Sequence, residues 1–207
     1  MRAAAWLLLL CCTACANQRW FAPRENRNGV GPDGSPAAVY AFGTAPDAER
    51  DGGELRVWAA GTRFVPDRDD EVELVVGFEL ENHGAEPLAL DTAALRCEAM
   101  TTDGQAATGL VPARWTGAAE APAGGMARIG ATFLLPECRH PRDLAQFTLQ
   151  FRVVANGRPV LVQATPFLPW IPDNDWRDDG WWWGRYRYPY GYCGPGIGFG
   201  WHHAYWW

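Results

Sequence analysis

One stretch of the chain alternates apolar and acidic side chains so strictly that it constrains the fold more than any other feature. Between residues 71 and 81 every second position is apolar, and most of the positions between them are glutamate. The apolar positions are Val72, Leu74, Val76, Phe78 and Leu80, and the acidic ones are Glu71, Glu73, Glu79 and Glu81. Because side chains on a β-strand point to opposite faces in turn, this stretch predicts a strand with one buried face and one acidic face.

Two further stretches, residues 127–135 and 147–153, show the same alternation, and four shorter ones are candidate strands. The shorter candidates are Val39–Phe42, Leu55–Ala59, Leu95–Met100 and Val160–Thr165. Turn signals rich in Gly, Asn and Asp separate these stretches, and the pair Asn156-Gly157 predicts a hairpin. No window of the sequence carries a convincing helical stripe. Residues 38–168 therefore predict an all-β domain, an immunoglobulin-like antiparallel β-sandwich.

The order of these strands adds a resemblance. A long strand ends at Asn82 in a turn, a short strand follows at residues 87–91, and Phe133-Leu134-Leu135-Pro136 ends a later strand. This arrangement resembles the telokin-like immunoglobulin-type domains that are common in bacterial lipoproteins, over about two thirds of the chain. The resemblance implies the sandwich fold. It implies no activity, because such domains share no active site.

The first residues have the pattern of an export signal. Arg2 precedes a short apolar run, which is too short to cross about 30 Å of hydrocarbon, so residues 1–14 predict a signal peptide. Thr13-Ala14-Cys15 then resembles the lipobox of bacterial lipoproteins. The resemblance implies that Cys15 is lipidated and becomes the mature N-terminus. It departs at one position, because Cys12 stands where a lipobox usually has Leu.

The same residues leave a second cleavage open. Ala14-Cys15-Ala16 also fits the small-x-small pattern, and cleavage after Ala16 would release a soluble periplasmic protein. In the lipidated alternative no Asp follows Cys15, and by the enterobacterial sorting rule this implies the outer membrane. The expected location is therefore the bacterial cell envelope, with a lipid anchor at Cys15.

Two segments outside the sandwich differ from it in composition. Residues 15–37 lack any period and are rich in Gly, Pro, Asn and Arg, which predicts a flexible tether. In residues 169–207, fourteen of 39 residues are aromatic, while Val and Leu are missing. Aromatic side chains without aliphatic partners do not form a close-packed core on their own. We therefore expect residues 169–207 to be a low-complexity, disordered tail.

The cysteines beyond the signal region raise the question of a disulfide. Cys97 lies on an inward-facing strand position, and Cys138 follows the end of another buried strand. In an oxidising envelope the two are expected to form a disulfide, which would stabilise the fold by roughly 3 to 4 kcal/mol in the loop-entropy model. Two separate buried thiols are the alternative. Cys193 in the tail has no predicted partner.

Composition excludes several kinds of chemistry. The chain has no lysine, so it holds neither a P-loop lysine nor a Schiff base, and its one serine, Ser35, lies in a turn-rich stretch. A formal net charge of −6 argues against a nucleic-acid partner. The four histidines and the aspartate clusters match no zinc or calcium pattern. The sequence therefore predicts no catalytic residue, no metal and no cofactor.

The tail contains one candidate contact surface, in which tyrosines recur at every second position with arginines between them. Its residues are Trp181, Trp182, Trp183, Arg185, Tyr186, Arg187, Tyr188, Tyr190 and Tyr192. Outside the cytoplasm such side chains suit a membrane interface or a protein partner, or they stack on glycan rings. The third alternative is an adhesive tail without a specific ligand.

Together these patterns predict a non-catalytic, lipid-anchored protein of the cell envelope with a structural or protein-interaction role. Its expected partners are the membrane, through the lipid, and other envelope proteins or cell-wall glycan. A glycan-binding module that uses the tail is the alternative function.

Overall fold

A computed structural model describes residues 18–43 and 52–171, and this part of the chain is almost entirely β-structure. The strands are β1 (Phe21–Pro23), β2 (Gly29–Val30), β3 (Pro36–Phe42), β4 (Gly53–Val65), β5 (Arg68–Asn82), β6 (Leu88–Leu90), β7 (Arg96–Thr101), β8 (Ala106–Leu110), β9 (Arg114–Gly117), β10 (Glu120–Ala121), β11 (Met126–Leu134), β12 (Leu144–Ala155) and β13 (Arg158–Pro169). A 3-10 turn, η1 (Pro141–Asp143), precedes β12. No helix within residues 18–43 and 52–171 is long and apolar enough to cross a membrane.

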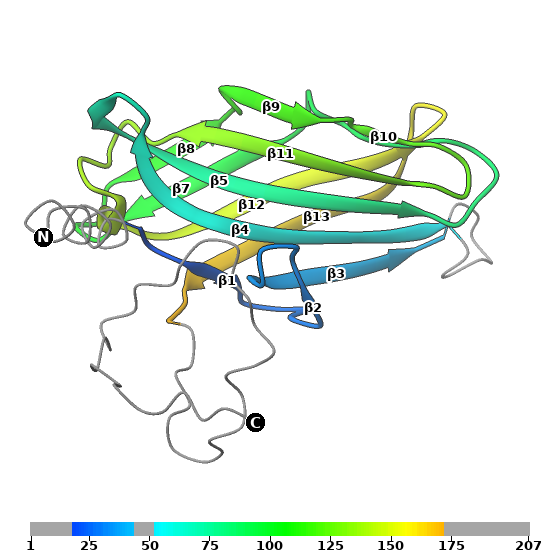
Figure 1. The fold of residues 1–207 in the computed structure, drawn as a ribbon, viewed down its shortest axis with the longest axis horizontal. Coiled ribbons are helices and arrows are strands. Elements are labelled where there is room, and N and C mark those ends of the chain that lie inside the picture. Colours follow the sequence, from blue (N-terminus) through cyan, green and yellow to red (C-terminus); the bar gives the residue numbers. More distant parts are fainter. Residues whose placement is uncertain (1–17, 44–51, 172–207) are drawn as a thin grey trace, which may run out of the picture.

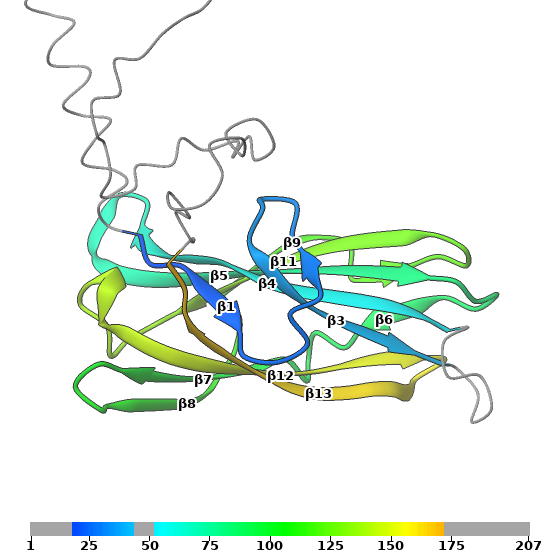
Figure 2. The same cartoon turned by 90° about the horizontal axis from the view of Figure 1, so that it is seen from below.

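The strands form two antiparallel sheets, which lie one over the other (Figures 1 and 2). Sheet A has the order β2-β3-β4-β5-β11-β9. Sheet B has the order β1-β13-β12-β6-β10, with β7 also paired to β12 and β8 paired to β7. The predicted all-β antiparallel sandwich is confirmed.

The core lies between the two sheets and follows the predicted alternation. In β5 the inward-facing residues are at most 1% exposed, namely Val72, Leu74, Val76, Phe78 and Leu80. The inward residues of β12 face them from sheet B. Phe147 of β12 stacks on Phe167 with ring centroids 4.7 Å apart, and it contacts Phe21 edge-on at 5.2 Å. Each such buried side chain stabilises the fold by roughly 1.5–3 kcal/mol relative to an exposed one.

The N-terminal boundary of the sandwich differs from the prediction. β1 pairs with β13, Phe21 is fully buried in the core, and β2 pairs with β3. The prediction of a flexible tether over residues 15–37 is therefore wrong for residues 18–37, which belong to the sandwich. Strands of two and three residues are too short to show a period in the sequence. The Gly- and Pro-rich stretch Gly31–Ser35, between β2 and β3, forms the turn that leads into β3.

At the other end, β13 runs to Pro169, so the sandwich also extends past residue 168. Trp170 donates its backbone N–H to the carbonyl of Trp20 at 2.9 Å, which joins the two ends of the described chain. The predicted hairpin at Asn156-Gly157 connects β12 to β13, and both residues have positive φ, at 49° and 75°. Two successive positive φ values are typical of the tight turns that Asn-Gly favours.

Candidate functional site

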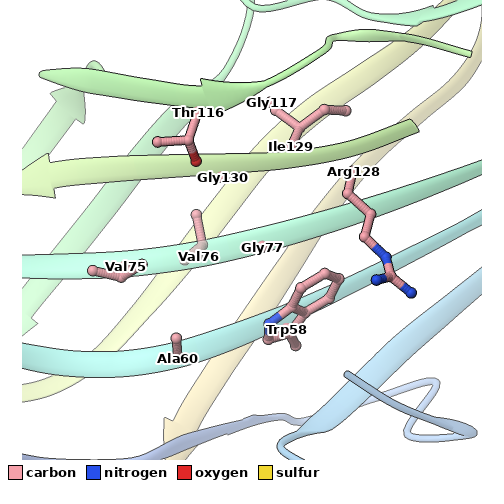
Figure 3. A pocket seen from close by; sticks show the side chains of 10 residues that line it. All are labelled: Trp58, Ala60, Val75, Val76, Gly77, Thr116, Gly117, Arg128, Ile129 and Gly130. Atoms are coloured by element: carbon pink, nitrogen blue, oxygen red, sulfur yellow. The ribbon is translucent and has the colours of Figure 1, made fainter. Parts of the chain in front are cut away.

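The outer face of sheet A carries a row of residues that runs across four strands. The strand register places Trp58 of β4 beside Gly77 of β5, Gly77 beside Gly130 of β11, and Gly130 beside Thr116 of β9. Two adjacent strands thus contribute glycine at the same level, and the flanking strands contribute an indole and a hydroxyl. Figure 3 shows this row from close by.

Trp58 lies across the sheet instead of standing away from it. A Cβ atom added at Gly77 would lie 2.2 Å from the indole ring, and one added at Gly31, in the turn between β2 and β3, would lie 2.7 Å from it. The indole is therefore held between two glycines, and only 8% of the residue is exposed. Because its faces are covered, Trp58 does not offer the free ring face that stacking on a sugar requires.

Beside the indole lies a groove of about 260 Å³ that crosses β5 and β11 (Figure 3). Gly77 and Gly130 form its floor, and Val75, Ala60, Thr116 and the edge of Trp58 form its sides. Arg128 lines one end. The groove is thus apolar at its centre and carries a positive group at its rim.

Two buried glutamates flank the groove along β5. Glu79 accepts hydrogen bonds from Arg56 Nη1 at 2.7 Å and from Arg128 Nε at 2.6 Å. Glu73, whose side chain is 0% exposed, accepts from Arg63 Nε at 2.7 Å and from Arg114. The predicted acidic face of β5 is therefore not a free acidic surface, because each of these carboxylates is paired with two guanidinium groups.

These ion pairs connect neighbouring strands of sheet A. Arg114 extends from β9 across β11 to Glu73 on β5, so this pair holds the outermost strand on the sheet. A buried carboxylate with two partners is stable only as long as those partners remain. These ion pairs therefore hold Arg128 at the rim of the groove and β9 on the sheet.

β9 forms an edge of sheet A, and among the described residues no strand pairs with its outer side. All four of its residues are exposed. Several large apolar side chains are also exposed on β9, on β11 or in the loop that leads into β9, namely Val111 (57%), Trp115 (36%), Met126 (49%) and Leu134 (41%). Exposed apolar side chains beside a free strand edge are typical of a protein-binding surface. Sequence reasoning did not find this strand, because four residues containing Arg, Trp, Thr and Gly show no alternation.

The two cysteines of the sandwich lie apart. Cys97 on β7 is opposite Leu149 of β12 and is fully buried. Cys138 lies near the carboxylates of Asp103 and Asp143, at the end of β7 that holds Thr101. Four residues of strand separate Cys97 from Thr101, which is about 13 Å.

A disulfide needs Cα atoms within about 7 Å of each other. The structure contains both Cys97 and Cys138 as free, buried thiols. The predicted Cys97–Cys138 disulfide is not found in the structure, which holds the two cysteines as separate buried thiols, the alternative.

Burial also makes these thiols unreactive. Desolvation raises the pKa of Cys97 to about 12. Desolvation, together with the carboxylates of Asp143, Asp103 and Glu137, raises the pKa of Cys138 to about 11. At pH 8 both groups are protonated, and the thiolate that attacks electrophiles is almost absent.

We therefore expect iodoacetamide at pH 8 to leave Cys97 and Cys138 unmodified in the folded protein and to modify both after unfolding in guanidinium chloride. Peptide mapping by mass spectrometry measures this directly. A Thr116→Cys variant on exposed β9 is the control and should react in the folded state. Recovery of a linked Cys97–Cys138 peptide, or fast modification of either thiol in the folded protein, would contradict the expectation.

The remaining predicted site residues lie outside the described part of the chain. These are Cys15 and the tail residues Trp181, Trp182, Trp183, Arg185, Tyr186, Arg187, Tyr188, Tyr190 and Tyr192. Within residues 18–43 and 52–171, no group of three or more His, Cys, Asp or Glu side chains is placed to hold a metal ion. His140 caps η1, where its Nδ1 accepts from the backbone N–H of Arg142.

Comparison with known proteins gives only distant likenesses. No protein-family profile matches the sequence, and no curated protein matches it. Among solved structures, a Bordetella pertussis protein given the name ApaA aligns with a TM-score of 0.33 and 15% identity, covering 57% of this chain and 94% of that one. A β-glucuronidase from glycoside hydrolase family 2 aligns with a TM-score of 0.30 and 12% identity, covering 62% of this chain and 12% of that one. TM-scores this low carry no argument about function.

Proposed function

We propose that this chain is a lipid-anchored protein of the bacterial cell envelope, that it is not an enzyme, and that it binds another protein along β9 and the adjoining groove. The anchor is the lipid expected on Cys15. The binding surface consists of the free edge of β9 together with the groove between Trp58 and Thr116. We name this combination the β9 surface.

The observation that supports this role most is the position of the groove beside the strand edge. A partner strand added to β9 would form backbone hydrogen bonds, which are independent of sequence. One of its side chains would enter the groove between Trp58 and Thr116, whose own side chains lie against Gly77 and Gly130. Strand addition next to a side-chain pocket is a recurring way in which proteins combine affinity with specificity.

The chemistry of the described side chains supports a non-catalytic role. Glu73 and Glu79 are each engaged by two arginines. Cys97 and Cys138 are buried and have raised pKa values. Neither pair therefore supplies the free base or the activated thiol on which general-base or nucleophilic catalysis depends.

In-cell photo-crosslinking tests this proposal. A photoreactive amino acid at Thr116 should crosslink to the same envelope protein in repeated experiments, whereas the same amino acid at Gln150, which is exposed on the outer face of sheet B, should not. Ala60→Arg places a long charged side chain in the groove and should remove the Thr116 crosslink. Circular dichroism confirms that the variants remain folded.

Two results would overturn parts of this proposal separately. Identical crosslinked products from Thr116 and Gln150, or a Thr116 crosslink that persists in Ala60→Arg, would remove the β9 surface from the function. A mature protein that begins at Asn17 without a lipid would remove the anchor. Binding of the protein to isolated peptidoglycan that depends on Trp181–Trp183 would favour the glycan-binding alternative instead.

A further inference from the structure

The two ends of the described chain meet at one place on the sandwich. Phe21 pairs with Pro169, and the backbone N–H of Trp170 donates to the carbonyl of Trp20 at 2.9 Å. Figures 1 and 2 show the start of β1 and the end of β13 next to each other. We name residues 18–20 together with 170–171 the exit patch.

The exit patch is fixed firmly to the sandwich. Gln18 Nε2 donates to the carbonyl of Ala60 at 3.0 Å, and the backbone N–H of Thr62 donates to the carbonyl of Arg19 at 3.0 Å. Gly61, between these two contacts on β4, has a φ of 101°, and a Cβ atom there would lie 2.6 Å from the Arg19 carbonyl. The left-handed conformation of Gly61 thus lets the N-terminal segment approach β4 this closely.

This arrangement limits the distance between the sandwich and a lipid on Cys15. Only Ala16 and Asn17 lie between Cys15 and Gln18. Three Cα-to-Cα steps span at most about 11 Å even when fully extended. The headgroup region of one leaflet is itself about 5 to 8 Å thick. A lipidated Cys15 therefore holds the exit patch against the headgroups.

The exit patch also carries side chains that suit this position. Ile171 is 78% exposed, and Trp20 and Trp170 beside it are half-buried. The Arg19 guanidinium, which donates to the backbone carbonyl of Arg142, lies close to lipid phosphates in this orientation. Apolar and tryptophan side chains combined with arginine are typical of a surface at the membrane–water interface.

The C-terminal segment starts at the same patch. Residues 172–207 contain thirteen Trp, Tyr or Phe residues, and Trp181 follows Ile171 by ten positions, a reach of at most about 36 Å. Trp and Tyr are enriched at the headgroup level of membranes. A segment tethered beside the bilayer meets it at a high effective concentration.

We propose that the exit patch faces the lipid bilayer and that the aromatic segment 172–207 binds the headgroup region of the same leaflet. This inference rests on the lipid anchor of the proposed function. It makes the bilayer surface a partner of the protein and fixes which end of the sandwich faces it. The turn between β12 and β13 then points away, since Arg158 lies eleven residues from Pro169 along β13, or about 36 Å.

Fluorescence quenching in reconstituted vesicles tests the orientation. The lipidated protein, in a Cys193→Ala background, is labelled with an environment-sensitive fluorophore at Ile171→Cys or, as the matched control, at Arg158→Cys. The vesicles contain phosphatidylethanolamine, phosphatidylglycerol and a lipid with a nitroxide on its headgroup. We expect quenching at position 171 to be at least threefold stronger than at position 158.

The outcomes separate this inference from the proposed function. Equal quenching at both positions, or stronger quenching at 158, with a lipid confirmed on Cys15 by mass spectrometry, overturns the orientation and leaves the anchor intact. A mature protein without a lipid on Cys15 overturns the proposed function and this inference with it.

A second measurement tests the aromatic segment without the lipid. The full chain with Cys15→Ala is mixed with the same vesicles lacking nitroxide, and binding is measured by co-sedimentation. We expect replacement of Trp181, Trp182 and Trp183 by alanine to weaken binding at least tenfold, whereas alanine at Asp173, Asp175 and Asp178 should not. Unchanged binding in the tryptophan variant would remove the aromatic segment from the membrane contact.

Discussion

Replacement of Asn82 by aspartate is expected to lower the free energy of unfolding by about 4 kcal/mol, because it removes a donor group that three buried or half-buried carbonyls share. Asn82 Nδ2 donates to the carbonyls of Glu86 at 2.8 Å, Ala121 at 3.1 Å and Pro122 at 2.9 Å. Its Oδ1 accepts from the backbone N–H of Gly84 at 2.9 Å, and only 2% of the residue is exposed.

The magnitude follows from what remains after the substitution. A buried acceptor left without its donor costs about 1–3 kcal/mol, and an ionised aspartate also brings a negative oxygen against the carbonyl oxygens. The deficit should shrink at low pH, because a protonated carboxyl regains one O–H donor. Urea denaturation at pH 7 and pH 4 measures both effects.

Asn28→Asp is the matched control, because it makes the same chemical change at an exposed position. It should change the free energy of unfolding by less than about 0.5 kcal/mol. A loss below about 1.5 kcal/mol in Asn82→Asp would mean that the turn between β5 and β6 is held by other contacts.

Asn82 also shows how far the sequence alone predicts this fold. The end of a long strand at Asn82 was predicted from the pattern of apolar residues and the turn signal that follows. The function of its amide was not predictable, because two of its partners, Ala121 and Pro122, lie 39 and 40 residues further along the chain. Local periodicity predicts strands, whereas such bonds depend on which strands become neighbours.

Because periodicity does not predict which segments become neighbours, the predictions of the N-terminal tether and of the disulfide differ from the structure. β5 and β12 have five or more inward apolar residues each, so their alternation was readable. β1 is three residues long, and it belongs to the sandwich through its pairing with β13 and the contact of Phe21 with Phe147. The disulfide prediction correctly placed Cys97 and Cys138 inside the protein, but burial does not determine how far apart two side chains lie.

The groove could not be predicted from the sequence for a related reason. Gly77 interrupts the acidic face of the β5 pattern, and in isolation a strand glycine indicates only a bulge or a close approach. Its role depends on Trp58 of β4 and Gly31 of the preceding turn, which the sheet register brings together. The two glycines and the indole therefore have to be tested as a unit.

We expect Gly77→Ala to destabilise the protein by about 2–3 kcal/mol and to do so only while Trp58 is present. The added Cβ would lie 2.2 Å from Cε2 and Cζ2 of the indole, and Gly31 on the other side blocks movement of the ring. Such overpacking typically costs 1–3 kcal/mol. The backbone at Gly77 does not require a positive φ, so the effect measures the contact alone.

A double-mutant cycle isolates this contact. Trp58→Ala alone should cost about 3–4 kcal/mol, as expected for removal of a buried aromatic side chain. In that background Gly77→Ala should be neutral, or stabilising by about 0.5 kcal/mol, because alanine loses less conformational entropy than glycine on folding. The coupling energy between the two positions should therefore be at least about 2 kcal/mol.

Gly130→Ala is the matched control within the same row. Its added Cβ would lie 2.4 Å from Thr116 Oγ1, a hydroxyl that can rotate away on the exposed edge strand, so the cost should stay below about 1 kcal/mol. Thermal or urea denaturation measures the free energy of unfolding of the wild-type protein, the two single variants of the cycle, the double variant and Gly130→Ala. These five values give the coupling energy and its control. If Gly77→Ala is equally costly with and without Trp58, the strain lies in the backbone of β5, and the indole is not what forms the wall of the groove.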